Sequence, residues 1–165
     1  MKYEYLKIIG LMTGTSMDGI DISLVKTNGK NLKRLNENYF YKFSSQTNNF
    51  LLSILDQSVT EILKNKKEYD QIITKEHYKA LKNLDILNQS DLIGFHGQTV
   101  YHNYLNKTSI QLGDPKELSR LLNKDIIFNF RSKDIELGGQ GAPLAPLYHK
   151  LIIEDLCLEL PTCIL

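Results

Sequence analysis

Nine of the ten glycines fall in four short segments, at residues 10–19, 94–97, 113 and 138–141. Glycine loses more backbone entropy on folding than any other residue, so such a concentration marks places where the main chain bends sharply or approaches a ligand closely. We expect all four segments to meet at one edge of a β-sheet. The polar residues beside these glycines are therefore the candidates for ligand binding or catalysis.

The first glycine segment has the residue types of an anion-binding turn. It contains Gly14, Thr15, Ser16, Met17, Asp18, Gly19, Ile20 and Asp21. Backbone N–H groups and two hydroxyls suit phosphate oxygens, while Asp18 and Asp21 offer carboxylates to a metal ion or to its water molecules. An ordinary polar hairpin turn has the same composition. The pattern leaves both interpretations open.

The second segment places His96, Gln98 and His102 just past a buried strand. Hydrogen bonding to a substrate suits His96 and Gln98 better than metal binding, because the sequence nearby offers no obvious third metal ligand. The alternative is a strand-end histidine whose nitrogens are satisfied within the fold. His77, in a polar helical pattern, is predicted to lie on the surface.

The third segment joins a cation and two carboxylates to a glycine run. Arg131 is one of only three arginines, against seventeen lysines, and this indicates a need for a planar, bidentate donor. Asp134 and Glu136 precede residues 138–141, so a carboxylate is expected at the mouth of the crevice where α/β sheets bind ligands. A surface ion pair between Arg131 and Asp134 is the alternative.

Hydrophobic periodicity predicts the elements that position these residues. Strands are expected over residues 5–13, 20–25, 37–44, 92–97, 109–113 and 126–130, and helices over residues 48–65, 72–87 and 115–123 and from Pro143 onward. The Asn28-Gly29 pair predicts a hairpin turn, so the first three strands form an antiparallel meander. Alternating helices and strands then predict an α/β domain with a mixed sheet.

Composition narrows the class of protein. The 165 residues are 42% hydrophobic and 24% charged, with a formal net charge of +1, which is typical of a globular domain with its own core. This balance gives no electrostatic footprint for nucleic acid or a membrane surface, and no apolar run approaches the ~20 residues of a membrane span. Cys157 and Cys163 are predicted to be reduced core thiols of a cytoplasmic protein.

Four motifs, in this order, carry a resemblance to a known family. They are Gly-Leu-Met-Thr-Gly-Thr-Ser-Met-Asp-Gly-Ile-Asp at 10–21, Gly-Phe-His-Gly-Gln-Thr-Val-Tyr-His at 94–102, Ser-Ile-Gln-Leu-Gly-Asp at 109–114 and Asn-Phe-Arg-Ser-Lys-Asp-Ile-Glu-Leu-Gly-Gly-Gln-Gly-Ala-Pro-Leu-Ala-Pro at 129–146. Together they closely resemble the anhydro-N-acetylmuramic acid kinase family. The resemblance implies an α/β, mixed-sheet lobe of the actin, sugar kinase and Hsp70 (ribonuclease H-like) superfamily, in which ATP lies between two lobes.

The resemblance also implies a reaction and roles for individual residues. With ATP and Mg²⁺, family members convert 1,6-anhydro-N-acetylmuramic acid to N-acetylmuramic acid 6-phosphate in peptidoglycan recycling. Residues 14–21 would bind the nucleotide phosphates, with Asp18 near Mg²⁺, and Asp134 would be the catalytic base. The residues that would face the sugar are His96, Gln98, Thr99 and Arg131. Asn129 departs from the family, which commonly has Asp at that position.

Residues 160–165 resemble the opening of a buried strand, and family members continue into a second lobe, so residues 1–165 are expected to form an N-terminal lobe that is inactive alone. A kinase for another sugar and a non-catalytic remnant or binding module are the alternatives. The partners left open are a homodimer, as in the full-length family, and a separate chain that carries the second lobe.

Overall fold

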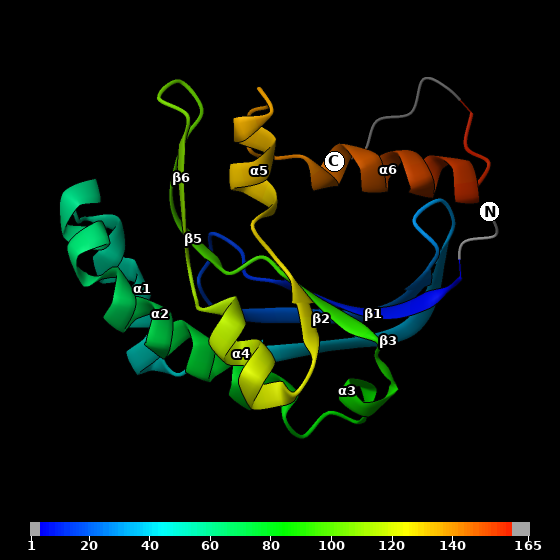
Figure 1. Cartoon of the computed structure of the whole chain (residues 1–165), viewed down its shortest axis with the longest axis horizontal. Coiled ribbons are helices and arrows are strands. Elements are labelled where there is room, and N and C mark those ends of the chain that lie inside the picture. Colours follow the sequence, from blue (N-terminus) through cyan, green and yellow to red (C-terminus); the bar gives the residue numbers. More distant parts are fainter. Residues whose placement is uncertain (1–3, 160–165) are drawn as a thin grey trace.

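A mixed sheet of five strands forms the centre of the fold, in the order β3-β2-β1-β4-β7 (Figure 1). The computed structural model describes residues 4–159. The strands are β1 (Leu6–Met12), β2 (Gly19–Thr27), β3 (Leu32–Lys42), β4 (Leu92–Phe95) and β7 (Asp125–Ile127). The first three form the predicted antiparallel meander, while β4 and β7 add in parallel to β1. The expected α/β class with a mixed sheet is confirmed.

Alternation along β2 shows how the sequence builds this sheet. Ile20, Ile22 and Leu24 are at most 2% exposed and point into the core, whereas Asp21 between them is exposed. The predicted turn after β2 is also present, since the Asn28 side-chain oxygen accepts the N–H groups of Lys30 and Asn31. Such a side-chain to backbone turn is the reason asparagine favours this position.

Six helices are present in the described part of the chain, with boundaries that differ from the prediction. They are α1 (Ser45–Leu55), α2 (Val59–Leu81), α3 (Asp85–Gln89), α4 (Pro115–Leu122), α5 (Phe130–Glu136) and α6 (Leu144–Asp155). The predicted helix over 48–65 is wrong because Ser58 and Glu61 form a capping box that starts a new helix. The predicted start at residue 72 is wrong because α2 continues through the polar residues before it.

A separate hairpin, which the sequence analysis missed in part, stands beside the sheet. It pairs β5 (Gln98–Asn103) with β6 (Thr108–Leu112) in antiparallel fashion. The predicted strand over 109–113 exists, but outside the main sheet. Gly97 connects β4 to this hairpin with a φ of +72°, and a Cβ atom there would collide with the Leu112 carbonyl, so the turn requires glycine.

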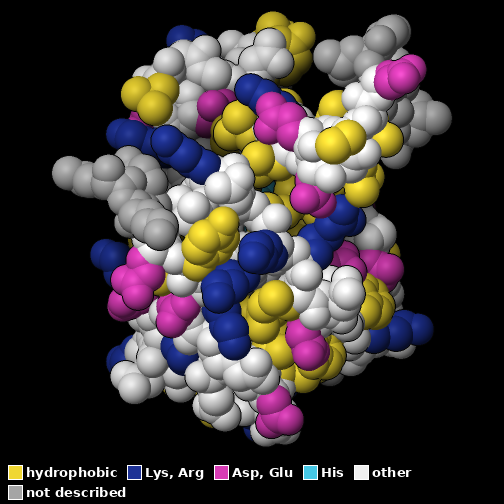
Figure 2. Space-filling view, turned by 90° about the vertical axis from the view of Figure 1, so that its right-hand side faces the viewer, with side chains coloured by type: hydrophobic (Ala, Val, Ile, Leu, Met, Phe, Trp, Pro, Cys, Tyr) yellow, Lys and Arg dark blue, Asp and Glu magenta, His cyan; other side chains and the backbone are white. Residues whose placement is uncertain are grey.

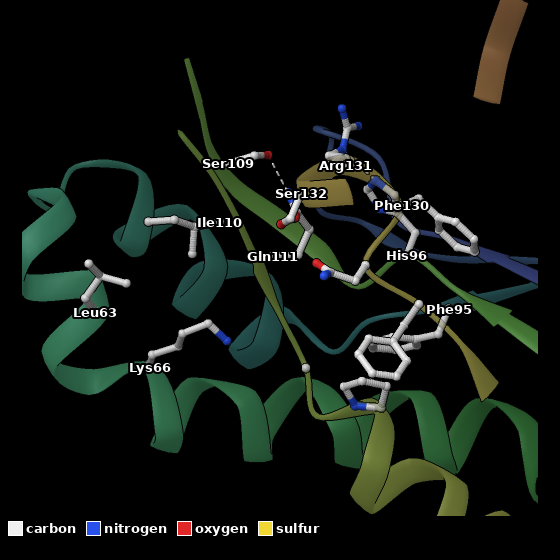
Figure 3. A pocket seen from close by; sticks show the side chains of 14 residues that line it. Leu63, Lys66, Phe95, His96, Ser109, Ile110, Gln111, Phe130, Arg131 and Ser132 are labelled. Atoms are coloured by element: carbon white, nitrogen blue, oxygen red, sulfur yellow. Dashed lines mark hydrogen bonds between the residues drawn. The ribbon is translucent and has the colours of Figure 1, made fainter. Parts of the chain in front are cut away.

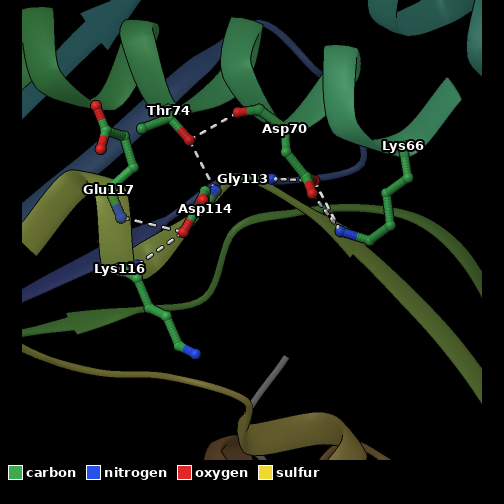
Figure 4. A network of polar contacts seen from close by, with 7 residues as sticks. All are labelled: Lys66, Asp70, Thr74, Gly113, Asp114, Lys116 and Glu117. Atoms are coloured by element: carbon green, nitrogen blue, oxygen red, sulfur yellow. Dashed lines mark hydrogen bonds and ion pairs between the residues drawn. The ribbon is translucent and has the colours of Figure 1, made fainter.

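Polar side chains of α2 fix the turn between β6 and α4 (Figure 4). The Asp70 carboxylate accepts the Gly113 N–H over 2.9 Å and binds Lys66 over 2.7 Å. The Thr74 hydroxyl accepts the Asp114 N–H over 2.7 Å. Asp114 in turn caps α4 by accepting the first free N–H groups of that helix. These contacts hold the hairpin and α4 against α2.

Two predictions about buried and exposed residues are wrong. His77 is 1% exposed, and its ring packs edge-to-face on Phe95 with 4.8 Å between the ring centroids. The helical pattern around it contains enough small and apolar residues to put this face of α2 in the core. Cys157 is exposed just after α6, so it is not a core thiol, and Cys163 lies outside the described residues.

Helices α2 and α4 cover one face of the sheet, and α5 and α6 lie on the other side (Figure 1). Helix α6 begins after Pro143, as predicted, and has no buried residue. Its end is joined to β3 by an exposed ion pair of 3.5 Å between Arg34 and Asp155. Figure 2, which faces the right-hand side of Figure 1, shows positive, negative and hydrophobic side chains interspersed over that surface. Within residues 4–159, no helix has the length and apolar character to cross a membrane.

Candidate functional site

Two of the four glycine segments predicted to converge, residues 10–19 and 94–97, contact each other where β1 and β4 end. The Thr13 hydroxyl donates to the Gly97 carbonyl over 2.8 Å, and the Gln98 amide nitrogen donates to the Gly14 carbonyl over 3.1 Å. These two bonds cross in opposite directions between segments 84 residues apart. They hold the loop after β1 against the turn after β4.

The loop after β1 is anchored by the buried Met17, while Thr15 and Ser16 are exposed. Met17 adopts a φ of +54° and is 1% exposed, and its carbonyl accepts from the Asn48 side chain over 2.8 Å. Thr15 and Ser16 are exposed, and their N–H groups have no hydrogen-bond partner within residues 4–159. Met17 and Ile20 have buried side chains, so only their backbone groups can reach a nucleotide. Successive free N–H groups in a turn suit an anion.

Asp18 and Asp21 are both exposed at this loop. The Ser16 hydroxyl donates to the Asp18 carboxylate, and this bond is the main cause that lowers the pKa of Asp18, with the charge of Lys42 adding to it. No group of three or more potential metal ligands exists in the described part of the chain. Mg²⁺ often takes one or two carboxylates plus phosphate oxygens and water, so an ionised Asp18 beside a turn with free N–H groups fits that ion.

His96 has both ring nitrogens in hydrogen bonds. Nε2 lies 2.8 Å from Arg131 Nε, and Nδ1 lies 2.7 Å from the Gly97 carbonyl oxygen. Because arginine can only donate and a carbonyl can only accept, the imidazole is neutral with its proton on Nδ1. Burial lowers the pKa of His96, and the charge of Arg131 lowers it further. The site thus contains a neutral histidine of one tautomer.

Arg131 and Asp134 do not pair with each other in the described structure; both bind Gly141. Arg131 Nη1 donates to the Gly141 carbonyl over 2.8 Å, and the Gly141 N–H donates to Asp134 Oδ2 over 2.8 Å. The two side chains lie one turn apart on α5, which places them on the same side of the helix. Asp134 Oδ1 has no hydrogen-bond partner within residues 4–159.

The predicted strand reaching Phe130 is wrong, and Arg131 does not directly follow a strand. Strand β7 ends at Ile127, and Asn129 then adopts a φ of +67° at the start of α5. Asparagine tolerates this left-handed conformation better than most residues. The Asn129 side chain makes no capping hydrogen bond. The residue contributes its left-handed backbone conformation, which leads the chain into α5.

Gln98 is fully buried beside the loop after β1. Its amide nitrogen donates to the carbonyls of Gly14 and Thr99, whereas its oxygen Oε1 is buried with no hydrogen-bond partner in the described structure. The amide orientation follows from these two carbonyl partners, since only the NH₂ group can donate. Gln98 therefore fixes the position of Gly14.

Two cavities share the walls formed by His96, Phe130 and Arg131. Figure 3 shows the side chains that line one of them. The larger measures about 300 Å³, and its polar lining includes Lys66, Ser109, Gln111 and Ser132. The smaller measures about 190 Å³ and is lined mainly by apolar residues, among them Met12 and Pro143. Sequence analysis did not identify the polar lining, because Lys66 comes from a helix distant in sequence and only the fold brings it close.

A mixed sheet with a glycine-containing loop after its first strand is consistent with one lobe of the sugar kinase class within the actin and Hsp70 superfamily. Sequence comparison makes the assignment specific. The profile of the anhydro-N-acetylmuramic acid kinase family matches residues 6–159, so the chain belongs to that family. The ordered motifs predicted this membership.

Individual relatives agree with the family profile. An anhydro-N-acetylmuramic acid kinase of Pelagibacter ubique is 40% identical over 98% of this chain and 45% of its own length. The Bradyrhizobium diazoefficiens enzyme of the same name is 33% identical over 94% of this chain and 45% of its own length. One from Ruegeria is 30% identical over 97% and 41%, respectively. The chain thus spans less than half the length of these curated relatives.

Proposed function

We propose that this chain forms the lobe that carries the catalytic base of an ATP-dependent anhydro-N-acetylmuramic acid kinase. In the proposed reaction, ATP and water convert 1,6-anhydro-N-acetylmuramic acid to N-acetylmuramic acid 6-phosphate. The relatives' names and the family match support this reaction. A cytoplasmic location is proposed with it, because ATP is the phosphoryl donor.

The geometry of Asp134 is the observation that carries the proposal. One carboxylate oxygen is fixed by the Gly141 N–H, and the other has no hydrogen-bond partner in the described structure. Asp134 is half-buried in the last turn of α5, and Arg131, one turn earlier on this helix, lines both cavities. A carboxylate held in this way suits a general base, because its free oxygen has a fixed direction.

One base is sufficient for the proposed chemistry. Asp134 takes a proton from the water that attacks the anomeric carbon, and the bond from that carbon to O6 of the sugar breaks. The freed O6 would accept the γ-phosphoryl group of ATP, with ADP as the leaving group, so a separate carboxylic acid to protonate O6 is not required. Arg131 has Nη2 unpartnered among residues 4–159, and this group is proposed to bind the sugar.

The loop of residues 14–21 is proposed to bind the phosphates. When bound, ATP would supply the phosphoryl group, and Mg²⁺ would neutralise charge on the phosphates. The free N–H groups of Thr15 and Ser16 would contact phosphate oxygens, and Asp18 would hold Mg²⁺ through its waters. Thr99, half-buried next to Gln98, is proposed to face the sugar.

The test joins this chain to the part of a relative that the chain does not match. We would fuse the chain to the remaining part of the Pelagibacter ubique relative, a protein called here the two-lobe fusion, and assay formation of the 6-phosphate. Asp134→Asn should lower kcat ~10²–10⁴-fold. Glu136→Gln is the matched control, because Glu136 is an exposed carboxylate on the same helix, paired with Lys133.

Three outcomes separate the candidate functions. Formation of the 6-phosphate that depends on Asp134 supports the proposal. Phosphorylation of a different sugar in preference would indicate the related kinase. A fusion that binds the anhydro-sugar in calorimetry yet forms no product, while the intact relative does, would indicate a non-catalytic lobe and contradict the proposal.

A further inference from the structure

A continuous line of hydrogen bonds joins the loop after β1 to the Asp134 carboxylate. It runs from Thr13 through the Gly97 carbonyl to His96, then to Arg131, and from there through both backbone groups of Gly141 to Asp134. We propose that His96 and Arg131 act as positioning residues within this line, holding Asp134 in place relative to the phosphate loop. The inference rests on the proposed role of Asp134 as the base.

Every link in the first half of the line has a fixed direction. The Gly97 carbonyl accepts from both the Thr13 hydroxyl, at 2.8 Å, and His96 Nδ1–H, at 2.7 Å. His96 Nε2 then has only a lone pair, which accepts from Arg131 Nε at 2.8 Å. A protonated His96 would lose this acceptor and face the guanidinium as a second cation. The line is therefore complete only with neutral His96.

The second half of the line leaves Gly141 little freedom. Its carbonyl is held by Arg131 and its N–H by Asp134, so both sides of this residue are bonded to one helix. Its φ is +81°, and a Cβ atom there would lie 2.9 Å from the His102 ring and 3.0 Å from Ile135. Movement of Arg131 therefore shifts the residue that orients the Asp134 carboxylate.

Occupied nitrogens favour an indirect role for His96. Both ring nitrogens are used inside the protein, so His96 has no further N–H or lone pair with which to bind a sugar hydroxyl. Arg131 retains only Nη2 for a ligand, while Nε and Nη1 serve the line. The arrangement explains why this position needs a guanidinium, since a lysine has a single nitrogen.

The first test needs no catalysis and uses the 165-residue chain. Nitrogen NMR of the His96 ring should show a proton on Nδ1 and none on Nε2. In Arg131→Lys, amide hydrogen exchange at Gly141 should become about tenfold faster, while the amides of the core residues Ile9 and Ile93 keep their rates. Lys133→Gln, which changes an exposed cation on the same helix, should leave Gly141 unaffected.

The second test separates positioning from direct sugar binding in the two-lobe fusion. His96→Leu should lower kcat about tenfold or more with KM for the sugar unchanged, and His96→Gln, which offers both a donor and an acceptor, should restore part of kcat. Unchanged Gly141 exchange in both Arg131→Lys and His96→Leu would overturn the inference. So would equal acceleration at Ile9 and Ile93, or a raised KM with normal kcat. Inactivity of the unsubstituted fusion, with the exchange results as expected, would contradict only the proposed function.

Discussion

The main chain of Gly139 lies directly against the Asp134 carboxylate, so closely that a Cβ atom on residue 139 would overlap the carboxyl group. The Gly139 N–H also donates to the backbone carbonyl of Asp134 over 2.8 Å, at the end of α5. Glycine is required here by space. The residue sets where the carboxylate can point.

Gly139→Ala should therefore displace the Asp134 side chain while the sheet stays folded. We expect kcat of the two-lobe fusion to fall by about 10²-fold, because a small misplacement of a base has a large effect on rate. The change is measured as kcat alongside thermal unfolding. Gln140→Ala, at the exposed next residue, is the control and should keep both values. Normal kcat in Gly139→Ala would show that Asp134 is not the base in this position.

Gly14 and Gly19 provide a contrast within the candidate phosphate loop. The nearest atom to an added Cβ on Gly14 is the Ser16 hydroxyl oxygen at 3.3 Å, a side-chain atom that can rotate away. A Cβ on Gly19 would collide with the Tyr41 carbonyl and the Phe40 ring. An added Cβ on the first glycine thus meets only Ser16, whose hydroxyl can rotate away, whereas the second glycine is enclosed by β3.

Gly14→Val should accordingly weaken ATP binding and leave folding nearly unchanged. The larger side chain obstructs the approach of phosphate to the loop backbone, so we expect KM for ATP to rise about tenfold in the two-lobe fusion. Gly19→Ala should instead lower the thermal unfolding temperature. An unchanged KM for ATP together with a large loss of stability in Gly14→Val would mean that the loop is only a structural turn.

Sequence analysis predicted the sheet better than the helices, for physical reasons. The strands carry strong alternation, as in Ile20, Ile22 and Leu24, and the Asn28-Gly29 turn has a recognisable mechanism. Helix α2 has a long polar stretch in its exposed part, so its periodicity fades although the helix continues. The capping box of Ser58 and Glu61 was visible in the sequence and would have placed the start of α2 correctly.

The sequence predicted which segments form the candidate site, but it did not predict the hydrogen bonds that join them. Glycine clustering indicated that the segments meet, and the bonds of Thr13 to Gly97 and of Gln98 to Gly14 confirm this for residues 10–19 and 94–97. Arg131 and Asp134 each bind Gly141, and the alternative of an ion pair between them is not found among the described residues. These two bonds depend on the path of the chain after α5. No local pattern contains that path.

Asp70 is a residue whose importance only the fold reveals, and its replacement should destabilise the protein. Asp70→Ala leaves the Gly113 N–H and Lys66 without their partner, and we expect a loss of about 1–3 kcal/mol in the free energy of unfolding, measured with urea. Glu117→Ala is the control, because Glu117 pairs with Arg120 on the surface of one helix and such pairs contribute little. Equal losses in the two variants would contradict this role for Asp70.

His77 makes the stability of the folded chain depend on pH. Its Nδ1–H donates to the Ile73 carbonyl over 2.8 Å, and Nε2 is buried with no hydrogen-bond partner in the described structure. Burial, the main cause, lowers the pKa of His77 from 6.5 to about 4; the bond to Ile73 and the charge of Glu76 oppose the shift. Because the unfolded chain takes up this proton first, the contribution of His77 to stability is fully present above about pH 6.5 and is lost as pH falls toward 4.

The free energy of unfolding should consequently decrease by about 2 kcal/mol between pH 6.5 and 5 through His77 alone. Urea unfolding of the 165-residue chain at a series of pH values measures this slope. In His77→Leu, which keeps an apolar side chain against Phe95 and removes the titrating group, the slope should become much smaller. His96, whose pKa burial also lowers, accounts for a residual slope of the same sign. If His77→Leu retained the full pH dependence, the proton taken up on acid unfolding would belong to another group.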